Sequence, residues 1–292
     1  MGKTYGIMVF INVMWGLSVI FSKQGMNAGF APMTLAFVRY VMAAAVLVPA
    51  LFLREKRPRL HREDFWMMLL SGLMGITVYY FCEYNGIQRT STVSASLILA
   101  AIPILTMVAE AVLMRSRLRP IQAIGALISL AGVGLIVLSS SSEGTDSLAG
   151  VLYILGASVV WVAYIFLSRR LRERYSSLAM NAWQSLFAVA TLLPAALAER
   201  PDLSQVSWEG WAAAAVLGLV CSALCYYLYG NALAVLSPLA SAIFINLIPL
   251  ATMVAGVLFL GERLTWMTLL GGALIIGSIF MVNLRAPSPH QD

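Results

Sequence analysis

The chain matches itself when it is shifted along its own length by 146 residues. Residues 102–109, Ile-Pro-Ile-Leu-Thr-Met-Val-Ala, reappear as residues 248–255, Ile-Pro-Leu-Ala-Thr-Met-Val-Ala, with six of eight positions identical. The same shift aligns further identical residues: Trp15 with Trp161, Ser22 with Ser168, Gly72 with Gly218, Tyr80 with Tyr226, and Gly125 with Gly271. The sequence therefore predicts a duplicated unit of roughly half the chain, and the fold must accommodate two similar copies.

Both copies consist of apolar stretches long enough to cross a lipid bilayer. Hydrophobic residues form 60% of the 292 residues and charged residues only 11%, whereas soluble domains hold about 25% charged residues. A membrane-spanning helix needs about 20 mainly apolar residues. Ten such stretches are present, at about residues 4–22, 31–53, 65–84, 91–114, 120–138, 148–168, 177–198, 209–229, 237–260 and 265–284. We therefore predict an all-α integral membrane protein with ten transmembrane helices.

The basic residues indicate which side of the membrane each end faces. The amino terminus, the even-numbered loops and the carboxyl tail hold fourteen of them: Lys3, Arg54, Lys56, Arg57, Arg59, Arg62, Arg115, Arg117, Arg119, Arg169, Arg170, Arg172, Arg174 and Arg285. The odd-numbered loops hold four: Lys23, Arg89, Arg200 and Arg263. Lys and Arg accumulate on the cytoplasmic side, so both termini are predicted to be cytoplasmic. Short loops cannot form the basic surface that nucleic acid requires, and we expect no nucleic-acid partner.

Each copy contains five predicted helices, and five is an odd number. The second copy therefore starts on the opposite face of the membrane and runs through it inverted. The predicted units are a first repeat over residues 4–138, a linker over 139–147, a second, inverted repeat over 148–284, and a cytoplasmic tail over 285–292. In proteins with such a 5+5 inverted-topology repeat, solute sites lie near the bilayer midplane between the copies.

The residues that carry most enzyme chemistry are scarce inside the predicted helices. Both histidines and all four aspartates fall in loops or near chain ends. The sequence has no H-E-x-x-H motif and no paired intramembrane aspartates. The cysteines Cys82, Cys221 and Cys225 are interpreted as packing residues; the one-turn spacing of the last two leaves a soft-metal site as the alternative. We expect no enzyme activity, no metal site and no cofactor.

Three charged side chains nevertheless lie inside predicted helices: Arg39, Glu83 and Glu110. A charge at the bilayer centre costs about 2.5–3.5 kcal/mol on insertion scales, so such residues usually face a cavity or a partner. Arg39 lies deepest, and Glu83, in the same outer half, is its predicted ion-pair partner. The alternative for Glu83 is an interfacial carboxylate. Glu110 either snorkels to the cytoplasmic surface or has a functional role.

The first helix of each copy carries an aromatic and hydroxyl-bearing face. Trp15, Ser18 and Ser22 lie at i, i+3 and i+7, on one side of the helix. Their equivalents in the second copy are Trp161, Tyr164 and Ser168. A lipid-facing surface has no use for hydroxyl groups, so we expect both faces to line a cavity that encloses an organic solute. The alternative is tight interhelical packing through serine hydrogen bonds.

Prolines interrupt the fourth predicted helix of each copy. Pro103 and Pro249 fall near the middle of the stretches at 91–114 and 237–260. Proline cannot donate to the carbonyl four residues earlier, so the oxygen atoms of Leu99 and Ile245 are freed and need another partner in lipid. Asn246 is a polar neighbour of the second break. Each proline is interpreted as a gating hinge or, alternatively, as the source of a fixed bend.

Several short motifs accompany the repeat. They are Trp15-Gly16, Phe21-Ser-Lys23, Phe37-Val-Arg39-Tyr40, the two prolines, and Gly261-Glu-Arg-Leu-Thr265. Together with the ten helices, over residues 5–284, they resemble the drug/metabolite transporter superfamily, specifically its ten-helix EamA-type exporters. The resemblance implies that helices one to four and six to nine enclose a central cavity, with helices five and ten behind them. It also implies export of amino acids or similar metabolites by alternating access across a bacterial inner membrane.

The two copies differ where specificity is expected. The mismatched pairs are Ser18 with Tyr164, Glu83 with Tyr229 and Ala100 with Asn246 at the shift of 146 residues, and Arg39 with Gln184 at a shift of 145, the same shift that pairs Pro49 with Pro194. The first copy also has Arg115-Ser-Arg-Leu-Arg119 where the second has Gly261-Glu-Arg-Leu-Thr265. Glu262 is therefore unmatched, and we expect it to order its loop and not to bind solute.

The sequence thus favours a secondary transporter that exports a small organic metabolite such as an amino acid. The predicted substrate-binding residues are Trp15, Ser18, Arg39, Tyr80, Glu83, Trp161, Tyr164, Tyr226 and Asn246. Glu83 is also the candidate for coupling to a proton. The expected partners are a small-molecule substrate and the lipid bilayer. Two alternatives remain: a flippase for a lipid-linked carrier in the same superfamily, which would need a phosphate site, and a membrane receptor or scaffold that transports nothing.

Overall fold

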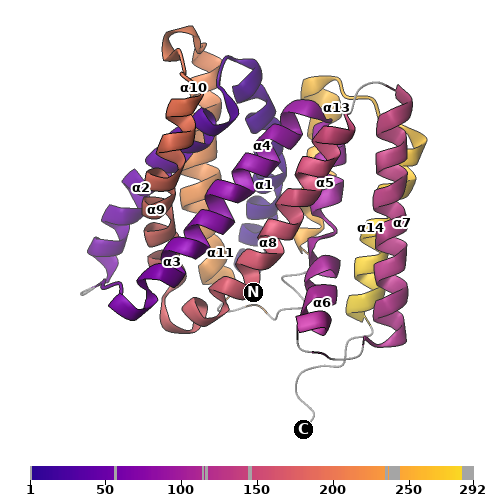
Figure 1. The fold of residues 1–292 in the computed structure, drawn as a ribbon, viewed down its shortest axis with the longest axis horizontal. Helices are drawn as coiled ribbons and strands as arrows, with labels where there is room; N and C mark the ends of the chain where they lie inside the picture. Colours follow the sequence, from indigo (N-terminus) through magenta and orange to yellow (C-terminus); the bar gives the residue numbers. More distant parts are fainter. Residues whose placement is uncertain are drawn as a thin grey trace.

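The protein is a bundle of helices in a computed structural model (Figure 1), which describes residues 2–55, 58–113, 115, 118–143, 147–233, 236 and 244–284. Every element in these residues is helical, which confirms the predicted all-α fold. Within them, eight helices are long and apolar enough to cross a membrane. Two shorter apolar helices, Leu247–Leu260 and Trp266–Val282, lie within the last two predicted spans. The predicted tail over 285–292 lies outside the described residues.

The helices of the first half follow one another in chain order. They are α1 (Gly2–Asn27), α2 (Pro32–Arg54), a long helix made of η1 (Arg62–Asp64), α3 (Phe65–Gly72), η2 (Leu73–Val78) and α4 (Tyr79–Arg89), then α5 (Thr92–Leu99), α6 (Ile102–Leu113) and α7 (Pro120–Glu143). The η2 segment is a π-helical stretch inside its long helix. Helix α7 continues through the first residues of the predicted linker, and 144–146 lie outside the described residues.

The second half repeats this order. Its elements are α8 (Leu148–Arg174), α9 (Ser177–Ala198), η3 (Leu203–Gln205), α10 (Trp208–Ala215), η4 (Val216–Leu224), α11 (Cys225–Leu233), α13 (Leu247–Leu260) and α14 (Trp266–Leu284). The η4 segment is π-helical too, and it overlaps the position of η2 when the chain is shifted by 146 residues. π-Helical stretches in α-helices are rare and frequently occur at functional sites.

Several helices extend beyond the predicted apolar stretches. Helix α1 ends at Asn27, α4 at Arg89 and α8 at Arg174, each several residues past the predicted end. The apolar pattern stops where the lipid stops, but a helix continues into water until a residue breaks it. After α1 that break is Gly29, whose φ of +108° is a conformation that favours glycine.

Helices that the repeat makes equivalent contact each other across the bundle. Helix α7 packs along α14 and α2 along α9; α5 packs against α13, which belongs to the matching fourth span of the other half. Other contacts occur in matched pairs. Helix α8 packs on η2 and α4, and its equivalent α1 packs on η4 and α11. Likewise, α1 packs on α13, and α8 packs on α5 and α6. This pattern is the one expected for two halves related by a twofold axis.

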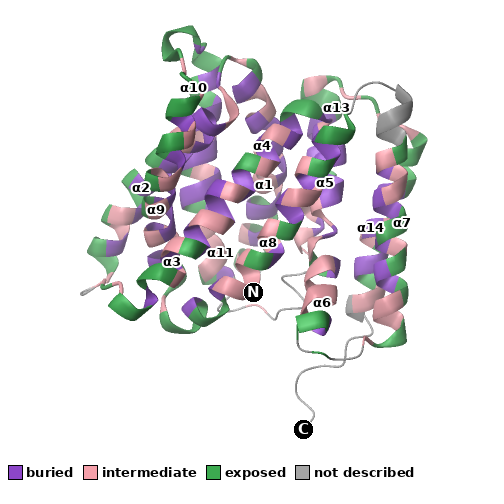
Figure 2. Ribbon diagram, in the orientation of Figure 1, coloured by how far each residue is buried: buried purple, intermediate pink, exposed green. Residues whose placement is uncertain are grey.

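The two ends of the bundle differ in charge, and its sides are apolar. In Figure 1, the start of α1 and the ends of α2, α8 and α14 lie at one end, and the ends of α1, α4, α9 and α13 at the other. Figure 2 shows that buried residues concentrate on the inner sides of the helices. Leu127, Val159 and Phe259 are at least 63% exposed on the outside. Apolar side chains exposed on this scale suit a lipid environment.

Helices α7 and α14 approach each other through glycine. A Cβ atom on Gly132 would lie 2.6 Å from the carbonyl oxygen of Gly271, and a Cβ on Gly271 would lie 2.6 Å from that of Gly132. Neither glycine can therefore carry a side chain without moving the helices apart. In contrast, a Cβ on Gly134, in the same helix as Gly132, would meet no atom within 4 Å.

We expect Gly132→Val to destabilise the protein by about 1–3 kcal/mol, the usual cost of overpacking. Gly134→Val is the matched control, because it makes the same chemical change in the same helix where space is open. The measurement is the Tm of the purified protein in detergent, followed by intrinsic fluorescence. A Tm lowered equally by both substitutions would show that the glycine contact does not set the packing of α7 on α14.

Candidate substrate site

A small chamber lies between the two halves, along the middle parts of the helices that line it. Its volume is about 20 Å³, which is room for about one water molecule. Elements from both halves contribute its walls, and the lining residues are Tyr40, Gly75, Ile76, Trp161, Tyr164, Asn181, Gln184, Ser185, Ser222 and Tyr226. An organic solute can occupy this chamber only after the helices move.

Aromatic rings form one wall of the chamber. The ring of Trp161 on α8 lies 4.9 Å from the ring of Tyr79 and 5.0 Å from that of Tyr164, measured between centroids. Tyr226 on α11 lies 5.2 Å from Trp15, whose indole Nε1 donates to the carbonyl of Cys221 at 3.2 Å. Trp161, Tyr164 and Tyr226 thus line the chamber, and Trp15 supports Tyr226 from behind.

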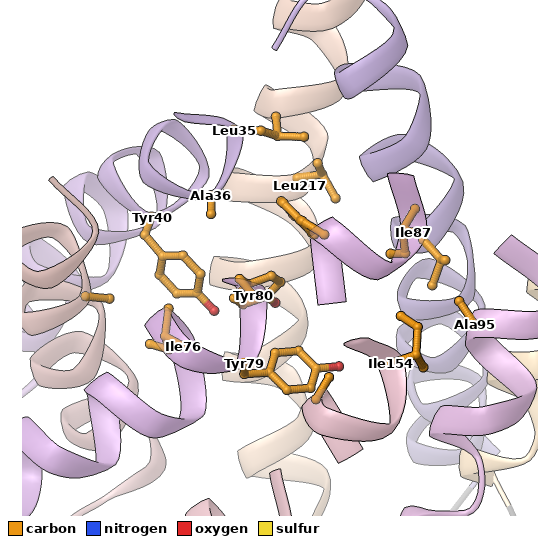
Figure 3. Close-up of a cluster of buried hydrophobic side chains, with 14 of the residues drawn as sticks. Leu35, Ala36, Tyr40, Ile76, Tyr79, Tyr80, Ile87, Ala95, Ile154 and Leu217 are labelled. Carbon is orange, nitrogen blue, oxygen red and sulfur yellow. The ribbon is translucent and has the colours of Figure 1, made fainter. Parts of the chain in front are cut away.

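Tyr40 connects this wall to a buried tyrosine cluster. Figure 3 shows Tyr40, from α2, beside Ile76 and close to Tyr80. The rings of Tyr40 and Tyr80 are 5.5 Å apart in an edge-to-face arrangement, and those of Tyr80 and Tyr84 are 5.0 Å apart. Edge-to-face pairs of this kind stabilise aromatic packing. Tyr80, a predicted binding residue, therefore lies in the layer behind the lining.

The guanidinium of Arg39 is buried behind the chamber wall, with only 3% of the residue exposed. Its Nε donates to the Ser222 hydroxyl at 2.7 Å, and Nη1 donates to the Tyr84 hydroxyl at 2.9 Å. Its Cζ atom lies 4.7 Å from the centroid of the Tyr80 ring, within the range of a cation–π interaction. Arg39 thus positions Ser222, which lines the chamber, and does not itself line it.

Glu83 does not form the predicted ion pair with Arg39. Its Oε1 accepts a hydrogen bond from the Tyr79 hydroxyl at 2.9 Å. The ion pairs among the described residues join Arg169 to Glu110 and Arg174 to Glu63 and Asp64. The predicted ion pair rested only on the similar depth of Arg39 and Glu83 in the outer half of the membrane. Because α4 continues to Arg89, Glu83 lies further from the end of its helix than predicted. Its hydrogen-bond partner is Tyr79, one turn earlier on the same helix.

A polar stripe on α9 forms the wall opposite the aromatic rings. Asn181, Gln184 and Ser185 all line the chamber. The Gln184 amide donates through Nε2 to the Ser71 hydroxyl at 2.9 Å and accepts at Oε1 from the Tyr164 hydroxyl at 3.3 Å. Sequence reasoning identified Gln184 only as the counterpart of Arg39 and missed its two neighbours. Their spacing of i, i+3 and i+4 in an apolar span was the available signal.

The other predicted residues do not line the chamber. Ser18 bonds to its own helix, with Oγ donating to the carbonyl of Trp15 at 2.6 Å, as the packing alternative for this face expects. Ser22 does the same to the carbonyl of Ser18 at 2.7 Å. Asn246, which is 8% exposed, directly precedes α13. Glu110 is half-exposed and lies 3.8 Å from Arg169, as expected for a snorkelling side chain.

Pro103 lies near the middle of the apolar span Thr92–Leu113, as predicted, and the helix of that span is interrupted just before it. The chain turns at Ala100 and Ala101, and Pro103 is the second residue of the new helix α6. Pro249 is likewise the third residue of α13, and the turn before it falls at Asn246. The first turn of a helix leaves its N–H groups without intrahelical partners, so proline is tolerated there. Both prolines therefore begin a helix.

Glu262 lies away from the chamber and orders a junction between the halves. Gly261 ends α13 with φ of +65°, and the following turn brings the carboxylate to the start of α5. Oε1 accepts from the Thr92 amide at 2.7 Å, and Oε2 accepts from the Val93 amide at 3.1 Å. These bonds satisfy amides that have no partner within the helix, which agrees with the expected role of Glu262.

We expect the double variant Arg39→Glu with Glu83→Arg to remain as impaired as either single variant. The two residues contact different hydroxyl groups, so exchanging their charges leaves Ser222 and Tyr84 without their donor. The measurement is the yield of monodisperse protein after size-exclusion chromatography, together with its Tm. Recovery of both quantities in the double variant would establish an ion pair and contradict this arrangement.

Comparison with known proteins identifies the family of this chain. The model of the EamA-like transporter family matches residues 3–138 and again 148–284. The chain is 27% identical to a probable terminal-alkyne amino-acid exporter of Streptantibioticus cattleyicolor, over 100% of this chain and 97% of the relative. It is 26% identical to the uncharacterized transporter YetK of Bacillus subtilis, over 86% of this chain and 78% of the relative.

Two further similarities concern part of the chain and the fold. The uncharacterized inner membrane transporter YhbE of Escherichia coli is 30% identical over 63% of this chain and 58% of its own length. One solved crystal structure shares the fold with a TM-score of 0.68 at 21% identity, covering 95% of each chain. Since the two matches of the family model together cover nearly the whole chain, the protein belongs to the EamA-like transporter family and is a multi-pass membrane protein.

Proposed function

We propose that the protein is a secondary transporter that exports a small organic metabolite, such as an amino acid, by alternating access. The observation that carries this proposal is the small chamber between the halves, lined by aromatic, amide and hydroxyl side chains. Solute sites of transporters with inverted repeats lie at this place, between the two copies. The amino-acid exporter among the relatives supports the choice of substrate class.

The proposed topology is a 5+5 inverted repeat of ten transmembrane helices. The double match of the family model and the matched helix contacts support two equivalent halves, which we place at residues 4–138 and 148–284. The end of the bundle that holds Arg54, Arg62 and Arg174 is the more basic one, so both termini are assigned to the cytoplasm. The bilayer is then the cell inner membrane.

The proposed substrate contacts are those of the chamber lining, with Trp161, Tyr164 and Tyr226 enclosing the solute. Arg39, Trp15 and Tyr80 act from the layer behind them. Stacking and edge contacts of rings bind organic groups without demanding one charge. Pro103 and Pro249 belong to the parts that we expect to move, because each proline follows a turn. Asn246 lies three residues before Pro249, and Ser18 lies two residues after Gly16, which packs against Ile248 of α13.

A flippase for a lipid-linked phosphate is less well supported. Such a substrate needs a cationic group facing the chamber, and none of the residues that line it is charged. The guanidinium of Arg39 is bonded to Ser222 and Tyr84 in the layer behind. The neutral lining therefore favours a soluble metabolite.

Trp161→Ala should abolish most export, because it removes the ring that contacts both Tyr79 and Tyr164. Untargeted metabolite profiling of the medium, with and without overexpression, identifies the exported compound, and uptake into proteoliposomes then measures its transport. Trp208→Ala is the matched control, since Trp208 is 75% exposed on the outside. Equal export by the two variants, or no metabolite that depends on the parent protein, would contradict the proposal.

Glu83→Gln should remove the pH dependence of transport while leaving the fold intact, if its carboxylate carries the coupling proton as we propose. The amide keeps an oxygen that accepts from the Tyr79 hydroxyl but cannot titrate. The measurement is uptake into proteoliposomes between pH 5.5 and about pH 8, with Tyr79→Phe as a control that retains the carboxylate. A parent-like pH profile for Glu83→Gln would rule out proton coupling through this residue.

A further inference from the structure

A second, larger hollow opens at the end of the bundle that we assign to the cytoplasm. Its volume is about 350 Å³, large enough for an amino acid. It lies between the end of α2, the start of α9 and the end of α11, and its lining includes Arg54, Glu55, Ser176, Ser177, Tyr227 and Gly230. We call it the inner cleft.

The inner cleft presents one cation and one anion side by side. Arg54 donates from Nη1 to the Tyr227 hydroxyl, and its Cζ lies 5.0 Å from the centroid of that ring. The Glu55 carboxylate accepts from the Ser176 hydroxyl at 2.5 Å. In the part of the chain that the structure describes, neither residue belongs to an ion pair. Among the described residues, the hydrogen-bond partners of both charges are neutral hydroxyl groups, which hold the two side chains in place.

The inner cleft lies directly below the chamber along the same helices. On α9, Ser177 lines the cleft and Asn181, one turn further, lines the chamber. On α11, Gly230 lines the cleft and Tyr226 lines the chamber. Gly230 touches Ser177 so closely that a Cβ on the glycine would collide with it. Both residues line the cleft, so α9 and α11 are in contact one turn away from the chamber.

The chamber and the inner cleft differ in the charge of the residues that line them. No charged residue lines the chamber, so the chamber cannot select a solute by its ionic groups. The inner cleft holds a guanidinium and a carboxylate at the entrance to the same path. An α-amino acid carries the matching pair, a carboxylate and an ammonium group on one carbon. Charge-assisted hydrogen bonds are about twice as strong as neutral ones.

We propose that the inner cleft is a loading site for a zwitterionic metabolite, with Arg54 binding its carboxylate and Glu55 its ammonium group. The solute then reaches the chamber when α9 and α11 separate at Ser177 and Gly230. The direction of this passage rests on the proposed function, whereas binding in the cleft does not. The cleft therefore selects the ionic groups of the solute and the chamber selects its organic part.

The test uses three probes that share one skeleton: L-phenylalanine, 3-phenylpropanoate and 2-phenylethylamine. Isothermal titration of the purified full chain in nanodiscs should give the lowest Kd for the zwitterion. Arg54→Gln and Glu55→Gln should each raise that Kd by at least about tenfold, as for loss of a charge-assisted bond. Glu55→Gln should leave the Kd of 3-phenylpropanoate near that of the parent, because its carboxylate partner is retained.

Controls separate this site from the chamber and from folding. Arg59→Gln changes an exposed arginine at the same end outside the cleft and should bind all three probes like the parent. Arg54→Lys keeps the charge and should recover part of the affinity. Trp161→Ala should retain binding in the cleft although it loses transport.

Each outcome decides one of the two proposals. Binding that depends on Arg54 and Glu55, without transport of any metabolite, supports the loading site and overturns the proposed export. Transport by Arg54→Gln and Glu55→Gln with the KM of the parent overturns the loading site and leaves export standing. Absence of phenylalanine binding, or equal affinity for the three probes, also overturns the loading site.

Discussion

The backbone of η4 rests on the backbone of α2 at Gly218, and the arrangement of the chamber depends on this contact. A Cβ on Gly218 would lie 2.7 Å from the carbonyl oxygen of Arg39, so the two helices cross without a side chain between them. The crossing brings Ser222, one turn further along η4, to 2.7 Å from the Arg39 guanidinium. The charge is thereby satisfied inside the bundle, as lipid requires.

The other half repeats this crossing with different chemistry. A Cβ on Gly72 would lie 3.3 Å from the carbonyl oxygen of Gln184, and Gln184 is the counterpart of Arg39. The amide bonds to Ser71 and Tyr164 and lines the chamber, whereas the guanidinium lies behind the wall. The duplicated backbone therefore provides two equivalent crossings, and the substitution of an amide for a guanidinium makes the space between them asymmetric. Two equivalent halves can move against each other as rigid units, and a chamber with different side chains on its two sides can recognise one solute.

The elements of the fold could be predicted because lipid imposes simple rules on the sequence. Helices must be long and apolar, and the 146-residue repeat indicates which of them are equivalent. The contacts of the site could be predicted less well. The depth of Arg39 showed that its charge needs a partner, but the identity of that partner depends on the crossing at Gly218. Ser222 and Tyr84 are distant in sequence from Arg39, and nothing in their local pattern marks them.

The residues of the first helical face illustrate the same limit. Trp161 and Tyr164 line the chamber, but Ser18 at the equivalent position returns its hydroxyl to its own helix. A serine hydroxyl can always find a backbone carbonyl within one turn, so a polar face does not by itself indicate a cavity. An aromatic ring has no such local alternative. Large rings repeated on one helical face therefore mark the lining together with the layer directly behind it: Trp161 lines the chamber, and its equivalent Trp15 packs against Tyr226.

The two ends of the bundle are joined across the halves by different kinds of interaction. At the end that we assign to the outside, Glu199 accepts from the amides of Met33 and Thr34 at 2.9 and 2.8 Å, and Glu262 binds the start of α5. Each carboxylate joins one half to the first turn of a helix in the other, where the helix dipole favours an anion. At the opposite end, Glu55 accepts from a single serine hydroxyl beside the inner cleft. The same end also holds the ion pairs of Arg174 with Glu63 and Asp64. Both ends are therefore joined across the halves, one by carboxylates on helix amides and the other by ion pairs between side chains.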